Sequence, residues 1–282
     1  MPIPVPGRLG EALRRSTVHV RVAGGRQEGS GSGIALTGDR VLTNAHVIRG
    51  GPITVEWWEG KATAATVTKV DRHRDLALLQ VPKLEAPPAT LGDSSRLKAG
   101  TPVIAVGNPL GFIGALSSGV VHALRSLSGG GPKWIHADVR LAPGSSGGPL
   151  ADFDGQVLGV NTMIIPSGLA LAIPSRAIQS FLLPAAKRKT LGVTIRSVQW
   201  RNGQTGLMIL EIEENSAAEK GSLLPGDILA GANSRKFRDT DDLQSAMDEA
   251  PDALLHVEFY RADKPELRRV AVELKQQVAN AA

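Results

Sequence analysis

The stretch Pro143-Gly144-Ser145-Ser146-Gly147-Gly148-Pro149-Leu150 sets two serines among three glycines and two prolines. Glycine lets the backbone turn sharply and leaves neighbouring N–H groups accessible. Such N–H groups can stabilise an oxyanion, and a serine hydroxyl beside them can attack a carbonyl carbon when a base takes its proton. The stretch therefore predicts a nucleophilic serine on a tight loop, which requires a base and a carboxylate elsewhere in the chain.

Two upstream segments supply those groups. Leu42–Val47 reads LTNAHV and contains His46, and Arg74–Leu79 reads RDLALL and contains Asp75. An imidazole can act as the base for a serine, and a carboxylate on its other nitrogen fixes the tautomer and stabilises the imidazolium. The chain order His46, Asp75, Ser146 matches that of the chymotrypsin class.

The second segment also offers alternatives. His73 lies two residues from Asp75 and could compete as base, although a surface turn residue is the simpler interpretation. Asp75 is favoured over Asp71 because it directly precedes the apolar strand expected at Leu76–Val81. Four further histidines are interpreted as structural: His19, His122, His136 and His256.

Short apolar runs broken by turn residues fill the chain from Thr17 to about Ile173. About ten strands at this spacing indicate a sandwich or a pair of barrels. Gly38-Asp39 is a hairpin signal, the Gly-rich stretches 24–33 and 129–131 are interpreted as loops, and Ser175–Leu183 as a helix. The expected strands are Val18–Val22, Gly33–Leu36, Arg40–Leu42, Pro52–Trp57, Ala65–Val70, Leu76–Val81, Thr101–Val106, Ser118–Leu124, Trp134–Asp138, Gln156–Val160 and Leu169–Ile173.

Five motifs together resemble the HtrA/DegP branch of the chymotrypsin class. They are TNAHV at 43–47, DLALL at 75–79, GNPLG at 107–111, SSGGPL at 145–150 and LAIPS at 171–175, within a resemblance that runs from about residue 16 to 275. The resemblance implies an all-β double barrel (chymotrypsin-like) of two six-stranded barrels with the active site between them.

The same resemblance implies a role for each site residue. His46 is the general base, Asp75 its orienting carboxylate and Ser146 the nucleophile. The backbone N–H groups of Gly144 and Ser146 form the oxyanion hole, which the loop Pro143–Ser145 sets. Ser145 stands where the family usually has Asn or Asp.

Family position also implies a specificity pocket, bounded by Leu141 and by the strand of Leu169, Ala170 and Leu171. These aliphatic side chains predict cleavage after small apolar residues such as Val, Ala or Leu. Arg140 lies six residues before the nucleophile. If Arg140 faced the pocket it would favour acidic residues, and the sequence leaves open whether it faces the pocket or solvent.

The pattern changes after Leu183. We expect a protease domain at 1–184, a linker at 185–190 with a short basic segment, a small α+β domain at 191–275 and a tail at 276–282. In this part, Leu191-Gly192-Val193, NSAAEKG at 215–221 and LPGDIL at 224–229 resemble a bacterial PDZ domain. Strands are expected at Val193–Val198, Leu207–Ile212, Ile228–Ala230, Ala253–Tyr260 and Arg268–Leu274, and helices at Ala217–Gly221 and Asp239–Glu249.

The PDZ resemblance implies a peptide-binding groove. Backbone N–H groups around Gly192, with Leu191 and Val193 beside it, would capture a terminal carboxylate, and the strand that starts at Val193 would pair with an extended peptide. Leu243 and Met247 would line the groove for the last apolar side chain of that peptide. Leu243 and Met247 fit equally well as ordinary core residues.

Composition excludes several other classes. Cysteine is absent, so disulfides, thiolate metal sites and thiol nucleophiles are excluded, and we expect no metal and no cofactor. Aromatic residues make up 4% of the chain, and the basic residues behind the net charge of +5 are scattered, so nucleic-acid binding is not expected. No apolar run is long enough to span a membrane.

The N-terminal 15 residues lack the apolar core of a secretory signal peptide. Taken literally, the chain is cytoplasmic; a removed leader would place it in the periplasm or another extracytoplasmic space, as the family implies. HtrA proteins commonly trimerise through aromatic residues near the N-terminus. The first aromatic residue here is Trp57, which argues against that trimer and leaves open another homo-oligomer.

The sequence thus favours an ATP-independent serine endopeptidase that acts on unfolded or damaged proteins, with a PDZ module for C-terminal or extended peptides. The alternative is a chaperone or peptide-binding scaffold in which proteolysis is dispensable or switched off. The complete set of His46, Asp75 and Ser146 favours the enzyme, because a pure binding protein needs none of them together.

Overall fold

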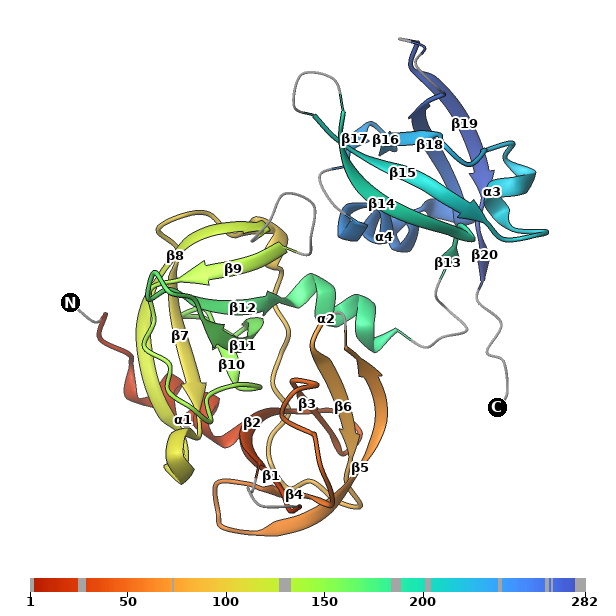
Figure 1. Cartoon of the computed structure of the whole chain (residues 1–282). Coiled ribbons are helices and arrows are strands. Elements are labelled where there is room, and N and C mark those ends of the chain that lie inside the picture. The colour runs from red at the N-terminus through yellow and green to blue at the C-terminus, as the bar shows by residue number, and fades with distance from the viewer. Residues whose placement is uncertain are drawn as a thin grey trace. The chain divides into compact units, whose positions relative to one another are not determined.

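The computed structural model of the chain (Figure 1) describes residues 3–24, 29–72, 74–126, 133–183, 189–200, 204–237, 240–261, 264 and 266–276. It divides into two compact units, residues 1–125 with 134–181 and residues 126–133 with 182–282. The first unit holds two closed β-barrels and the second an antiparallel sheet. The predicted all-β double barrel followed by a small α+β domain is confirmed.

Six strands close the first barrel in the order β1-β2-β3-β6-β5-β4. The predicted hairpin joins β2 to β3, and Gly38 and Asp39 have φ of 75° and 56°, the left-handed region that hairpin turns favour. The strands are β1 (Thr17–Val22), β2 (Gly29–Leu36), β3 (Arg40–Thr43), β4 (Ile53–Glu56), β5 (Ala62–Asp71) and β6 (Leu76–Gln80). The fully buried core includes Val18, Val20, Val41, Val55 and Leu79.

The Gly-rich stretch 24–33 is not all loop. β2 begins at Gly29 and pairs with β1 along its length. A Cβ on Gly31 would lie 2.6 Å from a methyl carbon of Val47, and one on Gly33 would lie 2.6 Å from a methyl carbon of Val41. The glycines therefore let a strand pass close to its neighbours, which composition alone does not distinguish from a flexible loop.

The second barrel closes in the order β10-β11-β12-β9-β8-β7. β10 was not predicted from the sequence, because its residues directly follow the Gly-rich loop and include Pro149. The strands are β7 (Pro102–Gly107), β8 (Ala115–Ser126), β9 (Lys133–Ala137), β10 (Pro149–Ala151), β11 (Val157–Ile164) and β12 (Ala170–Pro174). The buried core includes Val103, Val121, Ile135, Leu150 and Leu158.

Two helices accompany the barrels. α2 (Ser175–Leu182) lies where a helix was predicted, and Ile178 and Phe181 on it are fully buried. α1 (Gly7–Arg15) was not predicted. Its Leu13 is buried in a cluster with Ile104 and other residues of the second barrel, so this short helix is stabilised by packing rather than by sequence propensity.

The second unit is built on the sheet β14-β15-β16-β18-β19, in which β14 is an edge strand. α4 packs next to β14 and β16. The elements are β13 (Lys189–Thr190), β14 (Val193–Trp200), β15 (Gln204–Ile212), α3 (Ala217–Lys220), β16 (Ile228–Ala232), β17 (Arg235–Lys236), α4 (Thr240–Glu249), β18 (Leu254–Tyr260), β19 (Arg268–Glu273) and β20 (Lys275–Gln276). The core includes Leu207, Leu229, Phe237, Leu255 and Val257.

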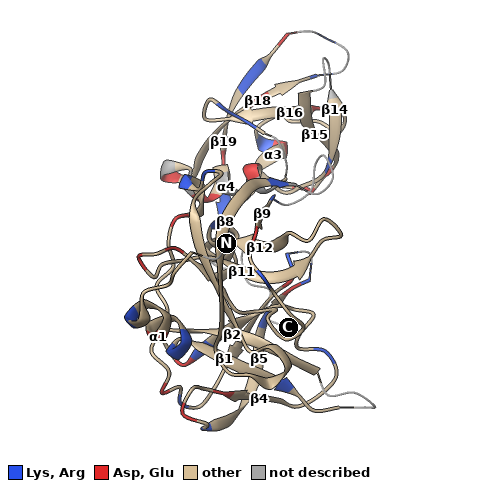
Figure 2. Cartoon of the chain, turned by 90° about the vertical axis from the view of Figure 1, so that its left-hand side faces the viewer, with Lys and Arg blue, Asp and Glu red and all other residues tan. Residues whose placement is uncertain are grey.

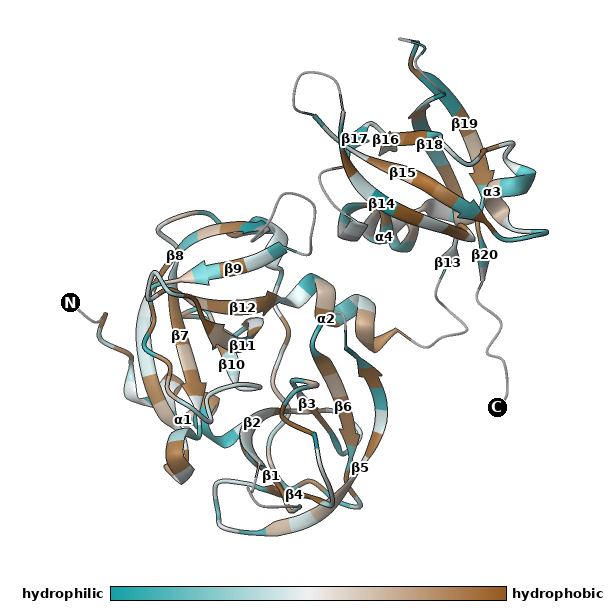
Figure 3. Cartoon of the chain, viewed as in Figure 1, coloured by the Kyte–Doolittle hydropathy of each residue, from teal (hydrophilic) through white to brown (hydrophobic). Residues whose placement is uncertain are grey.

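Charge and hydropathy are distributed as in an ordinary globular chain. Figure 2 shows Lys and Arg interspersed with Asp and Glu along both units. Figure 3 shows hydrophobic residues along β6, β7, β12 and β15. Among the described residues, no helix has the length and apolar character needed to cross a membrane.

Candidate active site

His46 and Asp75 meet where two neighbouring strands begin and end. β3 ends at Thr43 and β6 starts at Leu76, and the two strands are paired, so the residues just beyond their paired ends face each other. His46 Nδ1 lies 2.7 Å from Asp75 Oδ2, and the backbone N–H of His46 donates to Asp75 Oδ1 at 2.9 Å. The imidazole is thereby held in one orientation, with Nε2 on the side away from the carboxylate.

The backbone of Asp75 is held as firmly as its side chain. Asp75 has φ of 57°, an uncommon conformation for a non-glycine residue. Its carbonyl accepts hydrogen bonds from the side chain of Asn44 at 2.9 Å and from the N–H of Ala45 at 3.1 Å. The segment that carries His46 therefore also fixes the carboxylate that orients it.

Burial alone would raise the pKa of Asp75, but the hydrogen bonds and charge of His46 and a hydrogen bond from Thr162 lower it below its ordinary value. The carboxylate is thus kept ionised. The competing Asp71 is occupied elsewhere, since it accepts from the backbone N–H of Arg74 at 3.0 Å and pairs with its guanidinium. His73, the competing base, lies outside the described residues.

Ser146 sits on a loop that glycines shape. Gly144 and Gly147 have φ of 99° and 90°, and a Cβ on Gly147 would lie 2.0 Å from the carbonyl oxygen of Ser32. The Ser146 hydroxyl donates to the carbonyl of Thr162 at 2.7 Å, and the Thr162 hydroxyl donates to Asp75 Oδ2 at 2.9 Å. Thr162 therefore connects the predicted nucleophile to the predicted acid–base pair.

Thr162 was not predicted as a site residue from the sequence. The available signal was the polar pair Asn161-Thr162 inside the otherwise apolar strand β11, and both side chains are buried. A buried polar side chain needs a partner, and here the partner is the carboxylate of Asp75.

The predicted oxyanion donors are the backbone N–H groups of Gly144 and of Ser146 itself. In the described part of the chain, the N–H groups of Gly144 and Ser146 donate to no protein acceptor. The carbonyl of Pro143 accepts from the N–H of Leu110 at 3.2 Å, which directs it towards η2 (Pro109–Gly111). Because carbonyl and N–H of a trans peptide point in opposite directions, the Gly144 N–H is directed away from that turn.

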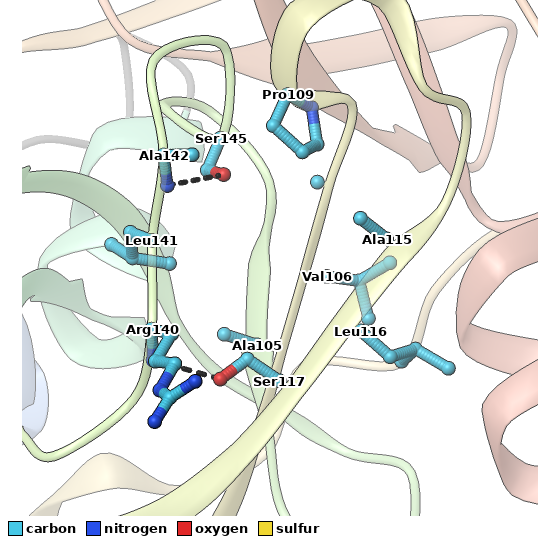
Figure 4. Close-up of a pocket in the computed structure, with 11 residues that line it drawn as sticks. Ala105, Val106, Pro109, Ala115, Leu116, Ser117, Arg140, Leu141, Ala142 and Ser145 are labelled. Carbon is cyan, nitrogen blue, oxygen red and sulfur yellow. Dashed lines mark hydrogen bonds between the residues drawn. The ribbon is translucent and has the colours of Figure 1, made fainter.

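The predicted specificity residues do not line one cavity. A cavity of about 110 Å³ behind the Ser146 loop is lined by Leu141, Ala142, Ser145 and residues of β7 and β8, but by none of residues 169–171 (Figure 4). Ala170 and Leu171 are buried in β12, with exposed fractions of 2% and 0%. Leu169 is partly exposed.

Arg140 lies at this same cavity and is exposed. Its backbone N–H donates to the hydroxyl of Ser117 at 2.7 Å, which Figure 4 shows as a dashed line. The structure thus assigns Arg140 to the rim of the cavity behind the loop.

The predicted peptide site of the second unit lies at the edge strand. Gly192 has φ of 73°, and a Cβ there would lie 2.3 Å from the Cβ of Ser216, so only glycine fits this turn. Leu191 is buried, whereas Val193 is partly exposed at the start of β14. Leu243 and Met247 on α4 are 2% and 7% exposed. They pack in the hydrophobic core, in agreement with the alternative that they are ordinary core residues.

The described residues were also searched for a metal-binding site. Among those residues, no group of three or more His, Asp and Glu side chains could hold a metal ion.

Two family matches cover most of the chain. Residues 31–160 match the Trypsin-like peptidase domain family, and residues 170–282 match the GRASP55/65 PDZ-like domain family. The chain is 33% identical over 277 residues to a probable periplasmic serine endoprotease DegP-like of Marinomonas. This protein is HtrA/DegP-like. The predicted resemblance is thus confirmed for both parts of the chain.

Two further relatives of this HtrA/DegP-like chain are also named as serine proteases. It is 31% identical to the putative serine protease HhoB of Synechocystis, over 87% of this chain and 66% of that protein. It is 28% identical to human serine protease HTRA3, over 77% of this chain and 56% of that protein. The chain therefore spans about 56–66% of these two relatives. The Marinomonas match covers 89% of this chain and 58% of that protein.

Solved structures share the fold. An HtrA-type protease AlgW with a tripeptide superposes with a TM-score of 0.70 at 24% identity, covering 96% of this chain and 97% of that one. The active form of the Rv3671c protease of M. tuberculosis superposes with a TM-score of 0.60 at 28% identity, covering 64% of this chain and 86% of that one.

Proposed function

We propose that the chain is an ATP-independent serine endopeptidase that cleaves unfolded or damaged proteins through His46, Asp75 and Ser146. The observation that carries the proposal is the bridge through Thr162. Its hydroxyl donates to the carboxylate that holds the imidazole, and its carbonyl accepts the Ser146 hydroxyl. Thr162 thus links the nucleophile Ser146 to the carboxylate of Asp75, which in turn holds the imidazole of His46.

In the proposed reaction, the Ser146 hydroxyl turns from Thr162 towards His46 Nε2, gives up its proton and attacks the scissile carbonyl carbon. The N–H groups of Gly144 and Ser146 stabilise the oxyanion. The amine leaves with the proton that His46 carried, and acyl-Ser146 remains. Water then gives a proton to His46 and attacks the ester carbonyl carbon. As the carboxylic acid leaves, His46 returns that proton to the Ser146 oxygen, and Asp75 stabilises the imidazolium in both steps.

We assign substrate selection to the aliphatic residues near the loop. Leu141 and Leu169 are partly exposed and can contact a substrate, whereas the buried Ala170 and Leu171 of strand β12 are left out of this assignment. An aliphatic surface of this kind favours small apolar side chains before the scissile bond, such as Val, Ala or Leu.

The second unit is proposed to bind C-terminal or extended peptides along β14. As an edge strand, β14 can pair with a further strand, and the turn at Gly192 lies at its start. We assign the protease domain to residues 1–184, the linker to 185–190, the PDZ domain to 191–275 and the tail to 276–282. Residues 184–188 and 277–282 lie outside the described residues.

A fluorophosphonate probe tests the enzyme proposal. We expect the folded wild type to be labelled and Ser146→Ala to take no label. Ser95→Ala serves as the control, because Ser95 is an exposed serine bonded to Asp93 and should leave labelling unchanged. Unfolded casein should be cleaved by the wild type and not by Ser146→Ala. A folded wild type that takes no label and leaves casein intact overturns the proposal.

One observation favours a second candidate, a peptide-binding scaffold with proteolysis switched off. The Ser146 hydroxyl donates to Thr162 and not to the imidazole. Casein cleavage with and without a peptide that ends in an apolar residue separates the candidates. A peptide-activated enzyme cleaves faster when the peptide is present, whereas a scaffold binds the peptide and cleaves nothing in either case.

A further inference from the structure

Ser32 of β2 lies completely buried beneath the Ser146 loop and has no part in the reaction proposed above. Its backbone N–H donates to the carbonyl of Ser146 at 2.7 Å, and its hydroxyl donates to the carbonyl of Gly144 at 2.7 Å. Gly144 and Ser146 are the two residues whose N–H groups are proposed to bind the oxyanion. One residue of the first barrel therefore holds both donor residues of a loop that belongs to the second barrel.

The direction of the Ser32 hydroxyl is fixed. Its oxygen accepts from the backbone N–H of Asn108 at 2.8 Å, so its own proton is directed to Gly144. Asn108 is itself fully buried, and its side chain donates to the carbonyl of Val18 at 2.7 Å and accepts from the N–H of Gly114 at 2.8 Å. The hydroxyl therefore cannot turn away without leaving buried polar groups unpaired.

The flanks of Ser32 allow this close approach. Gly31 and Gly33 leave no space for a Cβ, so β2 lies tightly against Val47 and Val41. The Ser32 carbonyl accepts from the hydroxyl of Thr43 at 2.6 Å, and Thr43 ends the strand that leads to His46. The sequence Gly31-Ser32-Gly33 thus connects the loop of the nucleophile to the strand that carries the base.

We propose that Ser32 is a positioning residue for the oxyanion hole, and this inference rests on the proposed peptidase function. Its hydroxyl and N–H fix the spacing of the Gly144 and Ser146 N–H groups. The hydrogen bond from Leu110 to Pro143 complements this by fixing the face to which the Gly144 N–H points. Preorganised donors stabilise the developing oxyanion more than the ground-state carbonyl. Ser32 should therefore affect turnover rather than substrate binding.

Ser32→Ala in the full chain tests the proposal with two readouts. With unfolded, fluorescein-labelled casein, we expect kcat to fall about 10- to 100-fold and KM to stay within about 2-fold, since loss of an oxyanion donor itself costs about 10²- to 10³-fold. The second-order rate of fluorophosphonate labelling should fall in parallel. Thr17→Val is the matched control, because the Thr17 hydroxyl on β1 is fully buried, donates to the carbonyl of Leu13 and touches neither Gly144 nor Ser146 among the described hydrogen bonds, so both readouts should stay within about 2-fold.

The two assays distinguish failure of the peptidase function from failure of the positioning role of Ser32. A wild type that takes no label overturns the peptidase function together with this inference. A labelled wild type with an equally reactive, folded Ser32→Ala overturns the positioning role alone, as does a rise in KM with kcat unchanged. If Ser32→Ala fails to fold by circular dichroism, Ser32→Cys keeps a weaker donor of similar size. It should then show an intermediate fall in kcat, and wild-type kcat overturns the role.

Discussion

Each unit of the protein contains a carboxylate paired with a basic side chain, and the two pairs differ in what they leave free. In the first unit, Asp75 lies 2.7 Å from His46 Nδ1, and 36% of the His46 side chain is exposed. In the second, Asp227 is 1% exposed and accepts from Arg261 Nε at 2.9 Å and Nη2 at 2.8 Å.

The guanidinium group of Arg261 donates to both carboxylate oxygens of Asp227 and also to the carbonyl of Ser222 at 2.7 Å. Asp227 receives a further bond from the N–H of Leu224, which shapes the turn at Gly226. His46 bonds to Asp75 through Nδ1, which leaves Nε2 for the proposed proton transfer. The same kind of pairing thus fixes a turn in one unit and, in the proposed mechanism, prepares a base in the other.

The largest expected effect is the loss of kcat when the His46–Asp75 pair is changed. Asp75→Asn should lower kcat for casein cleavage by roughly 10⁴-fold, because an amide at this position favours the wrong imidazole tautomer. Asp71→Asn is the control in the same segment and should leave kcat within about 2-fold. Comparable activity of Asp75→Asn and wild type would remove the functional contrast between the two pairs.

Arg261→Gln should act on stability instead. Removing one partner leaves Asp227 buried without its charge partner, which typically costs about 3–5 kcal/mol. Hydrogen exchange of peptides that cover β16 and β18 should become at least about 10²-fold faster, while casein cleavage by the first unit continues. Arg269→Gln is the control, because Arg269 pairs with Glu258 at the surface and should cost at most about 1 kcal/mol. Equal exchange in both variants would show that the Asp227 pair is no stronger than a surface pair.

The smallest expected effect is the pH dependence of the contribution that Asp75 makes to the free energy of unfolding. The pKa of Asp75 is lowered in the folded state, so its stabilising contribution is complete above the unfolded value of about 3.9 and disappears as pH falls through the folded value. The difference in free energy of unfolding between wild type and Asp75→Asn should be constant from pH 7 to about 5 and shrink below about 4. A difference that grows on acidification would contradict the lowered pKa.

The sequence predicted the barrels and the three candidate catalytic residues for different reasons. Apolar patterning is local, so the alternating strand β1 and the continuous apolar run of β6 could be predicted from their own residues. His46, Asp75 and Ser146 were found because each lies in a recognisable motif, and their catalytic roles remain the proposal made above. Thr162 and Ser32 were missed, because each acts through contacts with residues more than 80 positions away.

Packing explains the other misses. α1 depends on Leu13 fitting against the second barrel, and no pattern within nine residues encodes that surface. Leu171 was assigned to a pocket from its position in the family, but its side chain is fully buried. Whether an aliphatic residue of β12 lines an opening or fills the core depends on the whole barrel.

The open edge of β14 has a consequence for self-association. A strand that keeps N–H and C=O groups free for a peptide also offers them to the same strand of another molecule, which is a common route to aggregation. Arg196 is exposed near the middle of β14, so in an antiparallel pair of two such strands centred on this residue the two guanidinium groups would lie close together. Like charges so placed repel, so Arg196 should disfavour edge-to-edge pairing of copies while leaving the edge open to an uncharged peptide.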